Sequence, residues 1–225
     1  MKNKGKLIVF EGIDGSGKTT QAQLLIKALT SRNIEATYLH FPRVDNEHSL
    51  YGRFIKSYLK GELGKKETID PFFIAFLYAG DRKEMSTEIT LHVSRGSWLI
   101  LDRYVFSNIA YQGARVPEEK KQAFIQWVLL TEFETFELPR PDITFFLDMP
   151  LEFTISNLFK HRNQKDRVSV EADIHEKDVM FQQQVREMYL HVFKKEKDVI
   201  TIAYNDPVNI PSPVQIHNEI LQHLI

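Results

Sequence analysis

The chain has 225 residues, of which 43% are hydrophobic and 26% are charged, and its formal net charge is -1 without a single cysteine. This composition is typical of a globular protein with a sizeable core, and it gives no general basic field for nucleic acid or an anionic membrane. The lack of cysteine excludes disulfides, thiolate metal sites and a cysteine nucleophile. No apolar run approaches the roughly 18 residues of a membrane span. We therefore expect a cytoplasmic protein that binds neither nucleic acid nor membrane.

Five short apolar runs alternate with longer helical patterns. The runs are nearly continuous, as expected for strands of a parallel sheet that is covered on both faces. They are Leu7–Glu11, Ala36–His40, Trp98–Asp102, Ile143–Asp148 and Val199–Ala203. The helical patterns are Thr19–Thr30, Leu50–Leu59, Pro71–Val93, Glu118–Phe133, Leu151–Lys160, His175–Lys195 and Pro213–Leu224. This alternation predicts a doubly wound α/β fold with helices on both faces of the sheet.

One polar and heavily charged stretch, "KHRNQKDRVSVEAD" at residues 160–173, lies between two of the helical patterns. Its position and composition predict a short mobile lid, although an ordinary exposed loop is the alternative. The chain contains no internal repeat and no low-complexity segment. We therefore expect residues 1–225 to form one domain.

The first predicted strand is followed by "GIDGSGKT", which matches the pattern G-x-x-x-x-G-K-[ST] of a P-loop. Glycines in this pattern let backbone N–H groups cradle phosphate oxygens, and the following helix directs its positive end at the same place. Lys18 is expected to reach the β- and γ-phosphates, and the Thr19 hydroxyl to bind Mg²⁺. A glycine-rich turn without a ligand is the alternative. The predicted ATP-binding residues are Gly12, Ile13, Asp14, Gly15, Ser16, Gly17, Lys18, Thr19 and Thr20.

Asp102 and Arg103 end the third predicted strand in "LILDRY". Ligands of open α/β sheets gather at this end of the strands, so Asp102 is expected to join Thr19 in holding magnesium, and Arg103 to clamp a second phosphate. A helix-capping aspartate beside a solvated arginine is the structural alternative. The chain has no N-K-x-D motif and no D-x-x-G after a strand, which disfavours a GTPase.

Two further segments contain an arginine close to an aromatic residue. "HFPR" (His40–Arg43) ends the second predicted strand, and "FLYAGDR" (Phe76–Arg82) lies inside a helical pattern. Tyr78 and Arg82 are four positions apart and would share one helix face, where a ring can stack on a base and an arginine can bind it. Each residue alone is more typical of a core or a solvated surface.

In combination, these segments resemble the thymidylate kinase family, and the resemblance covers nearly the whole chain. The thirteen-residue block "DRYVFSNIAYQGA" is its most specific part. The resemblance implies a P-loop NTPase with a five-stranded parallel sheet, transfer of the ATP γ-phosphoryl group to dTMP to give dTDP, Mg²⁺ as cofactor, and a homodimer. The segments that carry it are Phe10–Gln21, Phe41–Arg43, Phe76–Arg82, Asp102–Ala114 and Arg140–Asp148.

The resemblance also implies roles around the phosphates. Asp14 would lie near the acceptor sugar and the water shell of magnesium. Arg43 and Arg103 would hold the dTMP phosphate. The catalytic residues expected on this basis are Asp14, Lys18, Asp102, Arg103, Arg162 and Arg167.

For the nucleoside, the resemblance implies that Tyr78 stacks on thymine, where the family usually has phenylalanine, and that Arg82 binds a thymine carbonyl. Asn108 would face the base edge, and Tyr111 would lie under the sugar and disfavour a 2′-hydroxyl. Gln112 is a weaker candidate. The expected substrate-binding set is Asp14, Phe41, Arg43, Tyr78, Arg82, Arg103, Asn108, Tyr111 and Gln112.

A cation is also expected beside the transferring phosphoryl group. Some thymidylate kinases carry it in the P-loop at the position of Gly15, which cannot serve here, so the lid should supply it. Arg162 and Arg167 are equal candidates. The lid is longer than the common family pattern, and "EADIHEKD" replaces the frequent "DR-x-E" lead into the next helix.

Three alternatives remain open at this stage. The chain could be another nucleoside monophosphate or deoxynucleoside kinase on the same scaffold, which a panel of acceptors would reveal. It could be a P-loop ATPase module, which would hydrolyse ATP without an acceptor, or an inactive binding protein.

The apolar stripes of Pro71–Val93 and Glu118–Phe133 could form a dimer face or pack on the sheet.

Overall fold

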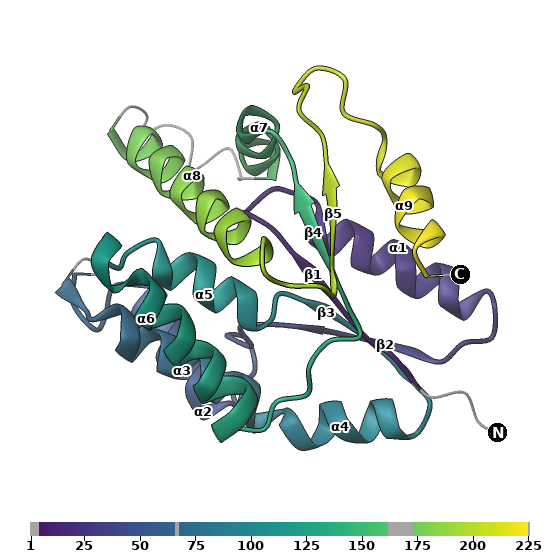
Figure 1. Ribbon diagram of the computed structural model, residues 1–225, viewed down its shortest axis with the longest axis horizontal. Helices are drawn as coiled ribbons and strands as arrows, with labels where there is room; N and C mark the ends of the chain where they lie inside the picture. Colours follow the sequence, from purple (N-terminus) through teal and green to yellow (C-terminus); the bar gives the residue numbers. More distant parts are fainter. Residues whose placement is uncertain (1–4, 66–67, 162–172, 225) are drawn as a thin grey trace.

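The computed structural model describes residues 5–65, 68–161 and 173–224 (Figure 1). Five strands form one sheet in the order β2-β3-β1-β4-β5, and every neighbouring pair is parallel. The strands are β1 (Leu7–Glu11), β2 (Ala36–His40), β3 (Trp98–Asp102), β4 (Ile143–Asp148) and β5 (Val199–Ala203). These bounds confirm the five predicted strands.

The helices cover both faces of the sheet, as the doubly wound fold predicts. Successive side chains of a strand point to opposite faces, so β1 contributes to two cores. Leu7 and Val9 pack in one core, against the side of α5, α6 and α8, while Ile8 and Phe10 pack in the other, against α1 and α9 (Figure 1). The helices are α1 (Lys18–Thr30), α2 (Leu50–Leu59), α3 (Pro71–Glu84), α4 (Ser86–Ser94), α5 (Val105–Gly113), α6 (Glu118–Leu129), α7 (Leu151–His161), α8 (Asp173–Phe193) and α9 (Pro213–Gln222).

Strand order places the functional ends of two strands side by side. The chain builds β2 and β3 on one side of β1 and then crosses to β4 and β5 on the other side. Strand β3 pairs with β1 so that Phe10 lies opposite Asp102. The residues that follow β1 and β3 therefore meet at the topological switch point, where open α/β sheets bind their ligands.

Five of the seven predicted helices begin and end within two residues of their expected bounds. The single helix expected over Pro71–Val93 is wrong, because the chain bends at Met85 and forms α3 and α4. The Met85 N–H donates to the carbonyl of Arg82 at 3.0 Å, which closes the last turn of α3.

The helix expected over Glu118–Phe133 also differs, because α6 ends at Leu129 and continues as a π-helical turn, η2 (Leu130–Thr135). In this turn the N–H of Phe136 donates to the carbonyl of Thr131 at 2.9 Å, five residues earlier. Among the described residues, no helix is both long and apolar enough to cross a membrane.

Candidate active site

The P-loop joins β1 to α1 and has the geometry of a phosphate cradle. Gly15 and Gly17 have φ angles of 80° and 93°, in the left-handed region that favours glycine. A Cβ on Gly15 would lie 2.3 Å from the carbonyl oxygen of Thr154 in α7, so no arginine fits there. An added Cβ on Gly17 would meet no atom within 4 Å, so the space before α1 is open. An anion can therefore approach the N-terminus of this 13-residue helix.

Lys18 is buried in the loop that it is expected to serve. Its Nζ donates to the carbonyl of Ile13 at 2.8 Å, so the side chain folds back over the P-loop. Burial lowers the pKa of Lys18 to about 8, the positive charge of Arg103 adds to this effect, and nearby carboxylates oppose it. A polyphosphate bound in the loop would favour the charged form and raise this pKa again.

The two predicted magnesium residues are in direct contact. Thr19 Oγ1 donates to Asp102 Oδ2 at 2.5 Å, and the Tyr38 hydroxyl donates to the same oxygen at 3.2 Å. Asp102 Oδ1 is buried and has no hydrogen-bond partner among the described residues. A buried carboxylate oxygen without a hydrogen-bond partner is free to bind a ligand. Hydroxyl and carboxylate oxygens are the ligands that Mg²⁺ prefers. Thr19 and Asp102 thus fit the metal that the sequence predicts.

The described residues contain no cluster of three or more metal-ligating side chains.

Arg103 lies between the P-loop and a neighbouring cavity. Its φ angle is 71°, and its backbone N–H donates to Phe10 of β1. The guanidinium donates to the carboxylate of Asp14, to the Tyr111 hydroxyl at 3.1 Å and to the Gly12 carbonyl at 3.3 Å. Its central carbon lies 4.8 Å from the centre of the Tyr111 ring. These contacts hold the guanidinium of Arg103 between the P-loop and the cavity.

Asp14 is held from two sides. Burial alone would raise the pKa of Asp14, but the positive charges of Arg103 and Lys18 outweigh it and leave the pKa below its usual value. Gln182 of α8 donates to Asp14 Oδ2 at 3.1 Å and accepts from the Asp14 N–H at 3.2 Å. Helix α8 therefore fixes the position of the P-loop carboxylate.

A cavity of about 190 Å³ opens beside Arg103. Its aromatic residues and few polar groups have the chemistry of a pocket for a nucleoside. Eight of the nine predicted substrate-binding residues line it, all except Arg43. The lining residues are Asp14, Phe41, Pro42, Leu59, Tyr78, Arg82, Arg103, Ser107, Asn108, Tyr111 and Gln112.

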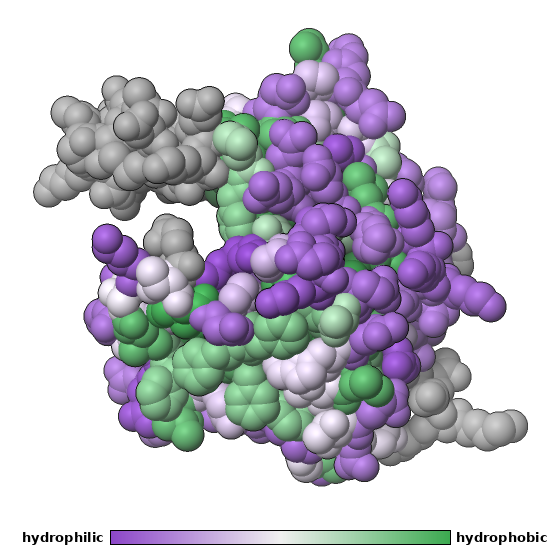
Figure 2. All heavy atoms as spheres, turned by 60° about the vertical axis from the view of Figure 1, so that its left-hand side comes forward, coloured by the Kyte–Doolittle hydropathy of each residue, from purple (hydrophilic) through white to green (hydrophobic). Residues whose placement is uncertain are grey.

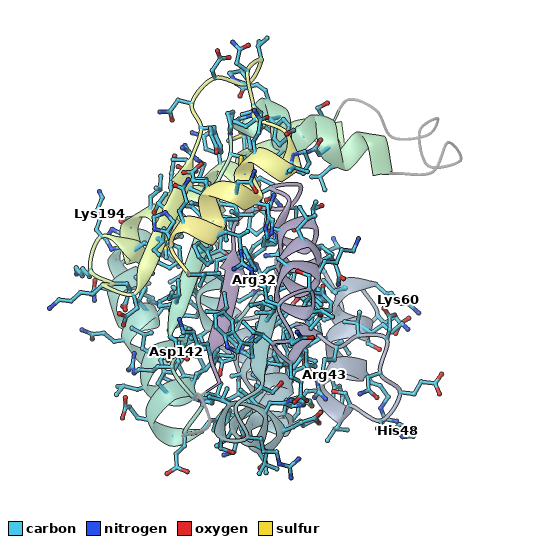
Figure 3. The ribbon with its side chains drawn as sticks, turned by 90° about the vertical axis from the view of Figure 1, so that its right-hand side faces the viewer. Arg32, Arg43, His48, Lys60, Asp142 and Lys194 are labelled. Atoms are coloured by element: carbon cyan, nitrogen blue, oxygen red, sulfur yellow. The ribbon has the colours of Figure 1, made fainter. Side chains whose placement is uncertain are left out.

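Arg43 follows Pro42 but its guanidinium is paired outside the cavity. Arg43 Nε donates to Asp81 Oδ1 at 3.0 Å, and Nη2 donates to Glu84 Oε2 at 2.5 Å. In Figure 3, Arg43 lies close to the ribbon, whereas the side chains of His48 and Lys60 lie at the outer edge. The structure therefore places Arg43 next to the predicted site without bringing it to the cavity wall.

Glu132 is a site residue that the sequence did not indicate. It belongs to the π-helical turn η2, and its side chain is fully buried. The two Glu132 oxygens accept from Arg82 Nε at 2.5 Å and from Arg82 Nη2 at 2.7 Å. Asn108 Nδ2 donates to Glu132 Oε1 at 2.8 Å. An acidic residue within an apolar helical pattern was the only signal available in the sequence.

Glu11 is a second residue that sequence reasoning missed. Its carboxylate, at the end of β1, accepts from the backbone N–H groups of Tyr104 at 2.9 Å and Ser107 at 3.1 Å, which cap the first turn of α5. It also accepts from the hydroxyls of Ser107 and Tyr189. Burial raises the pKa of Glu11, although these donors oppose the shift. The last residue before the P-loop thus anchors the helix that carries the cavity residues.

The predicted lid has its centre outside the described ranges. Arg162 and Arg167, the two candidates for the lid cation, both lie outside the described residues.

Comparisons with known proteins agree on one family. Residues 10–213 match the family model described as thymidylate kinase. The chain is 32% identical over 224 residues to a thymidylate kinase of Plasmodium falciparum (99% of this chain, 91% of the relative), and 32% identical over 210 residues to one of Carboxydothermus hydrogenoformans (92% and 93%). A solved thymidylate kinase from Candida albicans is 25% identical, with a TM-score of 0.70 over 98% of this chain and 91% of that one.

Proposed function

The chain belongs to the thymidylate kinase family, and we propose that it binds ATP at the P-loop and dTMP in the adjacent cavity. As a member of this family, it is an enzyme that transfers the γ-phosphoryl group of ATP to dTMP, giving dTDP. The observation that carries the division into two sites is the position of Arg103, which contacts the P-loop at Gly12 and Asp14 and lines the cavity. A P-loop ATPase module binds no nucleotide acceptor and therefore does not require a second, aromatic pocket.

At the donor site, we assign the phosphates of ATP to the loop formed by residues 12–20. Backbone N–H groups and the N-terminus of α1 would bind the β-phosphate, and Lys18 would neutralise charge on the γ-phosphoryl group as it moves. A dTMP phosphate oxygen attacks the γ-phosphorus, and the bond to the bridging oxygen of ADP breaks. Positioning and charge supply most of the catalysis in this chemistry, so no general base is required.

We further propose that Thr19 and Asp102 hold Mg²⁺ with the ATP phosphates. The bound ion would neutralise charge on the β- and γ-phosphates. Asp102→Asn keeps an oxygen for the Thr19 hydroxyl but removes the charge. We expect the half-saturating Mg²⁺ concentration to rise about tenfold or more, measured as turnover against Mg²⁺ at fixed ATP. Asp45→Asn, at a side chain that is 95% exposed, serves as the control. An unchanged Mg²⁺ dependence in Asp102→Asn would rule out this role.

At the acceptor site, we propose that Arg103 holds the dTMP phosphate and Tyr78 stacks on the base, with Phe41 and Tyr111 enclosing the nucleoside. Their positions around one cavity support this assignment. Arg43 remains a proposed second phosphate ligand, and it would have to exchange its contact with Glu84 for the phosphate. Arg82, Asn108 and Gln112 would face the base or the sugar.

The experiment that tests the proposal is a coupled assay of ADP release with ATP and Mg²⁺ against a panel of acceptors. We expect dTMP to be the best acceptor among nucleoside monophosphates, and thymidine to be inert because Arg103 would lack its phosphate partner. Preference for thymidine would indicate a deoxynucleoside kinase, and ADP release without an acceptor would indicate an ATPase.

We propose that Arg162 or Arg167 supplies the cation at the transferring phosphoryl group, within one kinase domain formed by residues 1–225. The absence of room for a side chain at Gly15 supports a source outside the P-loop. The turnover of Arg162→Ala and Arg167→Ala separates the two candidates, and near-normal turnover in both would reject the idea.

We also propose a homodimer in the cytoplasm. Figure 2 shows hydrophobic side chains gathered on the lower part of the face that carries α2, α3 and α6. Phe73, Phe76 and Leu130 are among the exposed residues of these elements and the adjoining η2, and an apolar surface of this kind suits a partner subunit. Sedimentation equilibrium tests the dimer.

A further inference from the structure

The buried contact between Arg82 and Glu132 carries an inference that rests on the proposed dTMP site and goes beyond it. Arg82 and Glu132 are 2% and 0% exposed, so both charges are removed from water. Glu132 Oε2 accepts from Arg82 Nε and Oε1 accepts from Nη2, which is the two-bond pairing of a guanidinium and a carboxylate. The pair holds the plane of the guanidinium at the cavity wall.

One nitrogen of Arg82 is left for a ligand. Arg82 Nη1 makes no hydrogen bond to any of the residues that the structure describes, while Nε and Nη2 are both committed to Glu132. Arg82 lines the cavity. The arginine can therefore offer the cavity a hydrogen-bond donor whose direction Glu132 determines.

Glu132 also determines which way the amide of Asn108 points. Asn108 Nδ2 donates to Glu132 Oε1 at 2.8 Å and to the carbonyl of Ala75 at 2.9 Å. Both partners are acceptors, so a reversed amide would place its oxygen against two other oxygens. Asn108 Oδ1 is consequently the free atom. This oxygen is buried, and it has no hydrogen-bond partner in the part of the chain that the structure describes. Asn108 itself lines the cavity.

We propose that Glu132 is a positioning residue for base selection. By holding Arg82 and Asn108 together, it presents one donor and one acceptor to the base. This pair complements a base edge with a carbonyl next to a ring N–H, as thymine has at O4 and N3. Cytosine carries the opposite pattern, an amino group beside an unprotonated ring nitrogen. Glu132 thereby acts on the choice of base although it does not line the cavity.

Glu132 continues the buried face of α6 into η2. Phe124 and Val128 of α6 are buried, and Glu132 follows Val128 by four residues, about one helical turn later. Glu132 and Phe133 are buried, whereas Glu134, two residues after Glu132, has a side chain that is 63% exposed. The same turn thus contains Glu132, whose role is to be tested, and Glu134, an exposed glutamate that serves as its control.

The test compares Glu132→Gln with Glu134→Gln. The glutamine at position 132 has nearly the same shape, but one of its two acceptors becomes a donor that faces Arg82 or Asn108. The Asn108 amide is then no longer confined to one orientation. We expect the KM for dTMP to rise about tenfold with kcat changed less than threefold, because Lys18, Asp102 and Arg103 are untouched. We expect the ratio of kcat/KM for dTMP over dCMP to fall about tenfold or more.

Glu134→Gln should keep the KM, the kcat and the ratio of the unaltered chain. An equal loss with dTMP and dCMP in Glu132→Gln, or an unchanged ratio, would overturn the proposal, because a merely structural ion pair affects both substrates alike. If the unaltered chain does not phosphorylate dTMP, the proposed function itself fails. Activity with dTMP together with an unchanged ratio in the variant rejects only the role of Glu132.

Circular dichroism and thermal unfolding check that Glu132→Gln folds. If it does not, Glu132→Asp provides the same comparison. The aspartate keeps a charge for Arg82, but its carboxylate is one methylene shorter and moves away from Asn108. A reduced dTMP/dCMP ratio in a folded Glu132→Asp supports the proposal, and a normal ratio overturns it. If neither variant folds, Glu132 serves folding rather than base selection, and the proposal is rejected.

Discussion

Lys18→Met should lower kcat by about 10³-fold while raising the thermal stability of the enzyme at neutral pH. In its proposed role, Lys18 places a fixed positive charge near the transferring phosphoryl group, where it acts mainly in the transition state; removal of one such group costs about 10²- to 10³-fold or more. The gain in stability follows because the folded chain keeps Lys18 buried with a lowered pKa. Methionine has a similar length and carries no charge to desolvate.

The pH dependence of this stability has a definite sign. The pKa of Lys18 is about 8 in the folded chain against 10.5 for an ordinary lysine. Between these values the unfolded chain binds more protons than the folded chain, so the free energy of unfolding rises with pH. The loss of folding stability caused by the buried charge is fully present below about pH 8, and it disappears as the pH rises toward 10.5. The free energy of unfolding of Lys18→Met should therefore exceed that of the unaltered enzyme by the largest margin near pH 7. The difference should shrink as the pH rises above 8.

The measurements are steady-state kinetics and thermal unfolding from pH 7 to 10. Lys27→Met, at an exposed lysine of the same helix α1, is the matched control and should change neither the rate nor the pH dependence of stability. Two results would contradict this account of Lys18. One is a kcat within tenfold of the unaltered enzyme, and the other is a margin in stability that does not depend on pH.

Arg103→Lys should lower kcat/KM for dTMP by about 10²- to 10³-fold although the charge is kept. The guanidinium fork of Arg103 reaches Asp14, Tyr111 and the carbonyl of Gly12 in one plane. An ammonium group has a different geometry, cannot stack on the Tyr111 ring in the same way and cannot bind a phosphate with two parallel hydrogen bonds. The effect should appear mainly in the KM for dTMP and in kcat, with a smaller change in the KM for ATP.

Arg95→Lys, at an exposed arginine after α4, is the matched control for the same exchange and should be neutral. The KM for each substrate is measured at saturating concentrations of the other. Normal kinetics in Arg103→Lys would show that a positive charge alone suffices at this position. The role of Arg103 as the link between two phosphate sites would then be wrong.

The sequence predicted what short-range patterns determine. The strands were recognisable because each is an apolar run bounded by polar residues, and the P-loop because its glycines, lysine and threonine have fixed spacing. The helix α5 was not predicted as a helix, since its first turn is capped by Glu11, a residue 93 positions before Tyr104. No local pattern could indicate a cap that comes from another strand.

The pairing of Arg82 with Glu132 was hidden for a similar reason. The two residues are 50 positions apart, and Glu132 lies in η2, a turn that the sequence did not predict. Arg43 was expected at the phosphate from its place after β2. The structure shows it paired with Asp81 and Glu84, which lie in α3 and were not considered as its partners. Charges that meet only after folding set the position of these arginines.

We propose that a donor site at the P-loop and an acceptor site in the cavity share Asp14 and Arg103 and are filled at the same time. The decisive experiment is a calorimetric titration of dTMP into the enzyme saturated with Mg²⁺ and a non-hydrolysable ATP analogue. We expect one dTMP to bind per chain, with an affinity at least as high as that for the enzyme without the analogue. Competition, in which the analogue prevents dTMP from binding, would contradict the claim.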